Sequence, residues 1–251
     1  MEHSGSDASR DRIIKAAIKL FSEKGYNGTR VSEISEAAKV NKALIYYYFK
    51  NKEAILDHLL ENIFVDIKEM ALGFIRENIV GIIKEGDLNI EENRFHFSDK
   101  HAMEYFLQNI YTYYERVIDY VVERRQVIRI LMLESLKQEK HQYNIFRFME
   151  MLEGRESNPI YKVIKNADSD FNIPTDTILF KFFFGLMPIF SFATYYDDWL
   201  RLNSVSEKKL RDSFLRNYRL IARIFIEDND ILITGVLPVP GECDSSEASQ
   251  G

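Results

Sequence analysis

The strongest constraint on the fold lies in residues 25–56, where two short helical patterns flank a four-residue connection and a third helix follows at once. The stretch has the sequence GYNGTRVSEISEAAKVNKALIYYYFKNKEAIL. Upstream, apolar residues recur at helical spacing, so a preceding helix can pack its apolar face against this pair. They are Ile13, Ile14, Ala17, Leu20 and Phe21. The pattern predicts a three-helix core and the start of a fourth helix within the first ~60 residues.

Residues that start and stop helices support these positions. The first helix is expected from about Ser9 to Lys24, ended by Gly25. Thr29 opens the second helix, Asn41 caps the third, and Asn51 caps the fourth. The fourth helix has a long apolar face, formed by Ile55, Leu56, Leu59, Leu60, Ile63 and Ile67. We expect it to connect the N-terminal core to the rest of the chain.

The whole chain is predicted to be all-α. It holds 5 Pro and 11 Gly in 251 residues, and no regularly spaced alternating segments indicate a β-sandwich or barrel. The stretch GDLNIEENRFHFSDK after Gly86 is interpreted as a polar loop. Helical patterns resume over residues 99–122, 125–137, 141–152, 159–165, 175–202 and 206–226.

These patterns divide the chain into three parts. Residues 7–67 are predicted to form a helix-turn-helix domain, with the motif itself at 30–49. Residues 68–227 form a larger helical domain, and 228–251 an acidic flexible tail rich in Asp, Glu, Gly and Ser.

Charge is distributed unevenly. The formal net charge is -6, which argues against a protein that coats nucleic acid without regard to sequence. Residues 1–60, however, hold ten Lys and Arg against eight Asp and Glu. Between residues 37 and 52 there are four lysines and no acidic residue. A small basic surface on an acidic body fits a site-specific DNA-binding protein.

Composition also indicates the compartment. Cys243 is the only cysteine, which excludes a disulfide within one chain, and the N-terminus resembles no secretory signal. We therefore expect a cytoplasmic protein. Residues 178–196 approach the length of a membrane span, but Lys181 lies within them and Asp197 and Asp198 follow. A buried or interface helix is the preferred interpretation, with no membrane partner.

Motifs for catalysis and metal binding are missing from the sequence. The five histidines show no metal-ligand spacing, and neither a nucleophile elbow nor a phosphate-binding glycine loop occurs. We expect no enzyme, no cofactor and no metal site.

Residues 12–56 resemble the N-terminal domain of the TetR family of bacterial transcriptional regulators. The similarity covers RIIKAAIKLFSEKGY, the Gly28-Thr29 step, VSEIS and ALIYYYFKNKEAIL. In the last run Tyr46, Phe49 and Lys52 match the family pattern. The pattern departs at Lys39, where the family commonly has Gly, and at Asn41, where it has Ser or Thr. A Lys that must adopt a left-handed backbone costs about 1 kcal/mol, whereas Asn caps as well as Ser.

The third helix is expected to place one face in the major groove. Lys42, Ala43, Tyr46 and Tyr47 should face outward, with Leu44 at the border. The resemblance implies that Tyr46 and Lys52 bind backbone phosphates and that residues 29–31 contact the flanking strand. The complete expected set is Thr29, Arg30, Val31, Lys42, Ala43, Leu44, Tyr46, Tyr47, Lys50 and Lys52. Alternatively, Tyr46 and Tyr47 pack between helices and Lys50 is only solvated.

The resemblance also implies a homodimer that binds a palindromic operator on double-stranded DNA. The interface is expected to be a four-helix bundle made from residues 175–202 and 206–226 of each subunit. A small lipophilic or aromatic effector is expected in the helical domain, whose central helices are rich in Tyr and Phe. Candidate contacts are Tyr111, Tyr114, Arg116, Glu134 and Phe183; each could instead be an ordinary core or surface residue.

The function these observations favour is a ligand-responsive repressor that the effector releases from DNA. Two alternatives stay open: a transcriptional activator, and a ligand-binding or interaction protein of the same fold that does not bind an operator.

Overall fold

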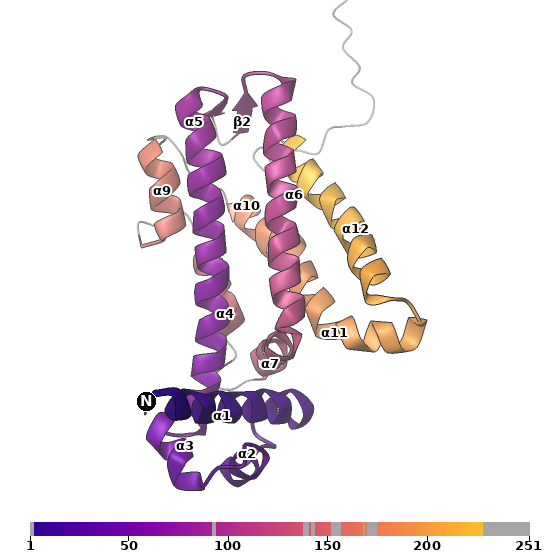
Figure 1. Ribbon diagram of the computed structural model, residues 1–251. Helices are drawn as coiled ribbons and strands as arrows, with labels where there is room; N and C mark the ends of the chain where they lie inside the picture. The colour runs from indigo at the N-terminus through magenta and orange to yellow at the C-terminus, as the bar shows by residue number, and fades with distance from the viewer. Residues whose placement is uncertain are drawn as a thin grey trace, which may run out of the picture.

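The computed structural model describes residues 3–91, 94–137, 141, 144–151, 157–167, 169 and 175–227. Within them the chain is helical apart from one two-stranded hairpin, which confirms the predicted all-α class. Figure 1 shows the first three helices of the chain gathered at one end of two long, roughly parallel helices. The predicted tail at 228–251 lies outside the described residues.

The N-terminal core consists of α1 (His3–Lys24), α2 (Val31–Ala37), α3 (Lys42–Tyr48) and the start of α4 (Lys52–Phe74). Ile13, Phe21, Ile34 and Ile45 meet in it and are fully buried. Two boundaries differ from expectation. Helix α1 begins at His3, before Ser9, and α2 begins at Val31 because Arg30 takes the extended cap conformation.

Helix α4 leaves this core and runs the length of the molecule, as Figure 1 shows. The helical path continues through a π-helical segment η1 (Ile75–Val80) into α5 (Gly81–Glu85). All six apolar residues predicted for the inner face of α4 are buried. Beside it lies the other long helix, α6 (Lys100–Glu123), which Asp99 caps by accepting a hydrogen bond from the Ala102 amide.

The predicted loop after Gly86 is wrong in part, because the chain forms an antiparallel hairpin of β1 (Leu88–Glu91) and β2 (Arg94–Phe97). Phe95 and Phe97 pack against Phe106 of α6 at ring-centroid distances of 5.7 and 5.4 Å. Apolar residues at alternate positions are typical of a strand with one covered face. The sequence did not indicate this strand pattern, because polar residues alternate with the apolar ones in both strands and fill the turn.

The remaining helices complete the larger domain. After α6 come α7 (Arg125–Ser135), a 3₁₀ turn η2 (Asn144–Phe146), α8 (Arg147–Glu150) and α9 (Pro159–Ala167). The helix predicted over 141–152 is thus two short pieces in the described part of this segment. A continuous run follows, made of α10 (Thr175–Phe180), η3 (Lys181–Leu186, π-helical) and α11 (Met187–Asn203), and α12 (Glu207–Glu227) returns along it.

A proline accounts for the irregular segment η3. Pro188 has no amide hydrogen to donate, and its ring would clash with the carbonyl four residues earlier in a regular helix. A wider π-helical turn relieves this conflict, and such turns are frequent at functional sites.

Among the described residues, one helical run, Thr177–Asn203, is long and apolar enough to cross a membrane, with a mean hydropathy of 1.6. Length and composition alone are weak evidence. Arg125 and Arg129 of α7 form ion pairs with Asp197 and Asp198 at 2.9 and 3.2 Å, which tie the end of this run to the helical domain.

Candidate nucleic-acid interface

The turn between α2 and α3 is tight and is built by local hydrogen bonds. Lys39 has a φ of 55°, the left-handed conformation expected at this position. The Val40 amide donates to the Ser35 carbonyl at 3.0 Å. Asn41 then caps α3 by accepting a hydrogen bond from the Leu44 amide at 2.7 Å, as predicted. These contacts set the angle at which α3 leaves α2.

Helix α3 has one buried and one exposed face. Ile45 is fully buried, and Leu44 and Tyr48 are half-buried. On the other face lie Lys42, Ala43, Tyr46 and Tyr47, all exposed. The side chains of Tyr46 and Tyr47 are 48% and 77% exposed, which excludes a purely packing role for Tyr47.

The exposed face is also basic. The Lys42 ammonium lies 5.8 Å from the Tyr46 ring centroid, and Lys39 and Lys50 are exposed at the two ends of the helix. Glu33 of α2 is occupied by an ion pair with Lys24 at 2.7 Å, and this hydrogen bond lowers the pKa of its carboxyl. The negative charge of Glu33 is therefore compensated within the protein.

The start of α2 corrects one prediction. Arg30 is exposed and Val31 half-buried, but Thr29 is only 1% exposed. Its hydroxyl donates to the carbonyls of Gly25 and Leu20 at 2.9 and 3.2 Å. The Thr29 side chain stabilises the loop after α1 and is not available to a DNA strand.

Lys52 also makes contacts within the protein. Its ammonium donates to the carbonyls of Tyr26 and Thr29 at 2.7 and 2.9 Å and lies 4.1 Å from the Tyr26 ring centroid. Burial, the largest cause, lowers its pKa. Lys52 thus connects the first turn of α4 to the loop between α1 and α2, and its contact with a DNA phosphate stays a prediction.

Glu134 of α7 links the two domains. Its carboxylate accepts hydrogen bonds from the Tyr26 amide at 3.3 Å and from Lys137 at 2.6 Å, and the residue is 1% exposed. We predicted Glu134 as an effector contact. Its position against the loop after α1 makes it a structural bridge instead, which could not be inferred without the tertiary fold.

A partly open cavity of about 150 Å³ lies between α4, α6, α12 and the η3 segment. Most of its lining is apolar, and the polar groups are Tyr113, Tyr114, Lys181 and Tyr218. Burial raises the pKa of all three tyrosines and lowers that of Lys181 to about 8. The Tyr218 hydroxyl donates to the Gly185 carbonyl at 2.7 Å, which satisfies a carbonyl in the irregular η3 turn.

The predicted effector contacts are dispersed. Tyr114 lines this cavity, and Arg116 lines a second, more polar hollow of about 360 Å³ between α4 and α6. Tyr111, Glu134 and Phe183 line neither. Tyr111 lies under Arg219 at 5.3 Å, and Phe183 is exposed on the outer side of η3. Lys181 and Tyr218 line the cavity but were not among the predicted contacts, since helical spacing alone does not show which side chains face inward.

Comparison with known proteins identifies the N-terminal core. The sequence profile of a family described as "Bacterial regulatory proteins, tetR family" matches residues 13–59. The N-terminal domain belongs to the TetR family. The match runs from the middle of α1 to the second turn of α4 and includes the exposed face of α3.

Two named regulators are similar to the chain in sequence over a segment of about this length. The chain is 44% identical over 64 residues to the HTH-type transcriptional repressor NicS of Pseudomonas putida, covering 26% of this chain and 30% of that protein. It is 49% identical over 55 residues to the negative regulator IcaR of the icaADBC biofilm operon in Staphylococcus epidermidis, covering 22% and 30%. The chain thus matches about a third of each relative.

Solved structures resemble the chain over a greater length but less closely. One of them is the transcriptional regulator FadR from Bacillus subtilis, solved in complex with stearoyl-CoA. It is 19% identical to this chain with a TM-score of 0.48, and the match covers 91% of this chain and 100% of that one. A TM-score below 0.5 does not establish a common arrangement of the C-terminal helices.

Proposed function

We propose that the protein is a DNA-binding transcriptional regulator that binds a palindromic operator as a homodimer and responds to a small-molecule effector. The observation that carries the proposal is the exposed, basic face of α3 in a TetR-type domain, with Lys42, Ala43, Tyr46 and Tyr47 side by side. A helix with this face fits the major groove, where base edges differ in their donors and acceptors.

The residues of this face differ in the contacts they can make. Lys42 lies in the first turn and can donate to guanine O6 and N7, while Ala43 and Leu44 permit close approach and contact with a thymine methyl group. Tyr46, Tyr47, Lys50 and Arg30 suit phosphate contacts, which fix the register without specifying the sequence. A repressor named among the relatives supports repression, though activation would use the same face.

Exposed apolar surface supports the homodimer. In the run Thr177–Asn203 only 28% of the most apolar window is buried within the subunit. Large apolar side chains stand out from this run and from α12, namely Leu179, Phe183, Phe184, Tyr195, Trp199, Leu202 and Leu220. A groove of about 390 Å³ between α11 and α12 continues this surface. A continuous exposed apolar surface is normally covered by a partner. A second copy of the chain that forms a four-helix bundle would cover it.

The 150 Å³ cavity is the proposed effector site. Ile67 of α4 lines it, so a bound molecule would touch the helix that carries the DNA-binding domain. The lining fits an apolar or aromatic body that also carries a group able to accept hydrogen bonds from tyrosine hydroxyls or from the Lys181 ammonium. The effector would change DNA affinity by its differential affinity for two orientations of α4.

Selection of fragments from the genome that encodes the protein tests this function. The full chain should retain a small set of fragments that share an inverted repeat with half-sites about 34–36 Å apart. Affinity should fall steeply as salt rises. Retention of all fragments alike, or of none, would refute the proposal and leave a ligand-binding protein of the same fold.

A further inference from the structure

The polar hollow between α4 and α6 has two walls of opposite character. It measures about 360 Å³ and lies between the two long helices that run side by side in Figure 1. The α6 wall carries two hydrogen-bond donors, Asn109 and Arg116. The α4 wall, which η1 continues, carries two acids, Glu69 and Glu77. In each wall the two residues are about two helical turns apart, so they lie on the same face of the helix.

Asn109 lacks a hydrogen-bond partner in the wall of this hollow. Its amide nitrogen is buried and donates to no acceptor among the described residues. Nearly all buried polar groups in folded proteins have a partner, so an exception beside a cavity indicates a group that binds there. An amide nitrogen only donates, and the missing group is therefore an acceptor, supplied by a ligand or by a water molecule.

The charged side chains of the two walls do not pair with each other. In the described part of the chain, no ion pair or hydrogen bond involves the side chain of Arg116, Glu69 or Glu77, and all three are exposed. Positive charge thus faces the hollow from α6 and negative charge from α4. A head group with a carboxylate toward the α6 wall and an ammonium toward the α4 wall is complementary to both.

Tyr113 lies between this hollow and the cavity of about 150 Å³, because its side chain lines both. Its ring stacks on Phe74 at a centroid distance of 4.7 Å. Small-molecule sites usually measure about 300–1,000 Å³, so the cavity alone is small for an effector and the hollow supplies the missing room. An apolar cavity of about 150 Å³ holds a group of the size of benzene.

We propose that the hollow and the cavity form one site for a molecule with a zwitterionic head and a benzene-sized apolar end. Aromatic α-amino acids and their longer homologues are the matching class. The head lies between α4 and α6, and the apolar end passes Tyr113 into the cavity. Gly73 leaves room for the head, since a β-carbon at this position would meet no atom within 4 Å. The inference rests on the proposed function, whose effector site it completes.

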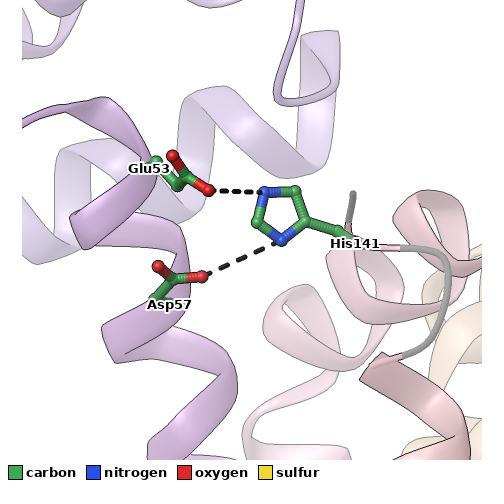
Figure 2. Close-up of side chains that lie close together, drawn as sticks. All are labelled: Glu53, Asp57 and His141. Atoms are coloured by element: carbon green, nitrogen blue, oxygen red, sulfur yellow. Dashed lines mark ion pairs between the residues drawn. The ribbon is translucent and has the colours of Figure 1, made fainter. Parts of the chain in front are cut away.

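The other end of α4 contacts the helical domain where the DNA-binding domain begins. The buried ring of His141 lies between Glu53 and Asp57 of α4, with its nitrogens 3.9 and 3.8 Å from their carboxylate oxygens (Figure 2). A head group inserted between α4 and α6 farther along the helix would tilt α4 about this contact. We expect operator affinity to change about 5- to 150-fold, the usual range of coupling between sites.

Calorimetric titration of the full chain with three matched probes tests the site. The first probe, 2-amino-4-phenylbutyrate, carries both charges. The second, 4-phenylbutyrate, lacks the ammonium, and the third, 3-phenylpropylamine, lacks the carboxylate. We expect one zwitterion to bind per chain, at least tenfold more tightly than either of the other probes.

Two variants place the binding in the hollow. Gly73→Leu fills it and should abolish binding, and it should fold because leucine is more favourable than glycine inside a helix. Asn109→Leu keeps the size of the side chain but removes the donor, and should weaken binding about tenfold. Gly81→Leu is the matched control, because Gly81 belongs to the same helical path but does not line the hollow. It should bind the zwitterion like the wild type.

Failure of the site and failure of the proposed function give different results. No saturable binding of the zwitterion at millimolar concentration would overturn the site and leave water as the partner of Asn109. Equal binding by the wild type and Gly73→Leu, or equal affinity for the three probes, would also overturn it. Because the titration contains no DNA, zwitterion binding that is lost in Gly73→Leu would uphold the site even if no genomic fragment were selected. Selection of an operator without zwitterion binding would uphold the proposed function alone.

Discussion

At the scale of single residues, the least favourable backbone position is Lys39. A non-glycine residue at a φ of 55° pays a steric cost that glycine avoids, and glycine in turn loses more conformational freedom on folding. We expect Lys39→Gly to raise the free energy of unfolding by about 0.5–1 kcal/mol.

Urea denaturation measures this difference. Lys39→Ala is the control, because it removes the same charge but keeps the β-carbon, and it should not stabilise the protein. If both variants had the same stability, charge and not backbone strain would explain the effect.

Lys181 leads to a prediction about pH. Burial lowers its pKa to about 8, from an ordinary value of 10.5, so between these values the unfolded chain binds a proton that the folded protein does not. Stability contributed by this group therefore rises with pH across that window, by at most about 1.4 kcal/mol per pH unit. The free energy of unfolding of the wild type, relative to Lys181→Met, should increase from pH 8 to 9.5. A constant difference would contradict the burial of the ammonium.

At the scale of elements, the contact between α7 and the loop after α1 holds the two domains together. Glu134→Ala would leave the Tyr26 amide and the Lys137 ammonium without their partner, and we expect a loss of about 1–3 kcal/mol in unfolding free energy. Glu123→Ala is the control. It removes an exposed acid at the end of α6 whose one ion pair in the described part of the chain is with Arg124, and it should lower the unfolding free energy by less than about 0.5 kcal/mol. Thermal denaturation of both variants compares the two contacts; equal effects would mean that Glu134 does not bridge the domains.

Local sequence patterns predicted the helices more accurately than they predicted the tertiary contacts between them. Asn41 and Asn51 cap their helices as expected, and the inner face of α4 agrees residue by residue, because capping and helical periodicity depend on near neighbours in sequence. The roles of Thr29, Lys52 and Glu134 depend on carbonyls and amides brought close only by the tertiary fold.

At the scale of the whole molecule, the homodimer is the main requirement for binding a palindrome. Leu220 of α12 is 61% exposed within the subunit, so a charge there would not disturb the subunit core. Leu220→Lys should convert a dimer to a monomer in sedimentation experiments and should abolish tight operator binding. Lys208→Glu, which changes charge at an exposed position of the same helix that is not apolar, is the control and should remain dimeric. A dimeric Leu220→Lys protein would contradict the proposed interface.

The most direct test of the proposed function is a fluorescence anisotropy titration of a selected operator and a scrambled duplex with the wild type and Lys42→Ala. If the exposed face of α3 specifies the sequence, the wild type binds the operator at least a thousandfold more tightly than the scrambled duplex at physiological salt. Lys42→Ala should lose about 1–3 kcal/mol on the operator and much less on the scrambled duplex. Equal affinity of the wild type for both duplexes, or an unchanged preference in Lys42→Ala, would contradict the account.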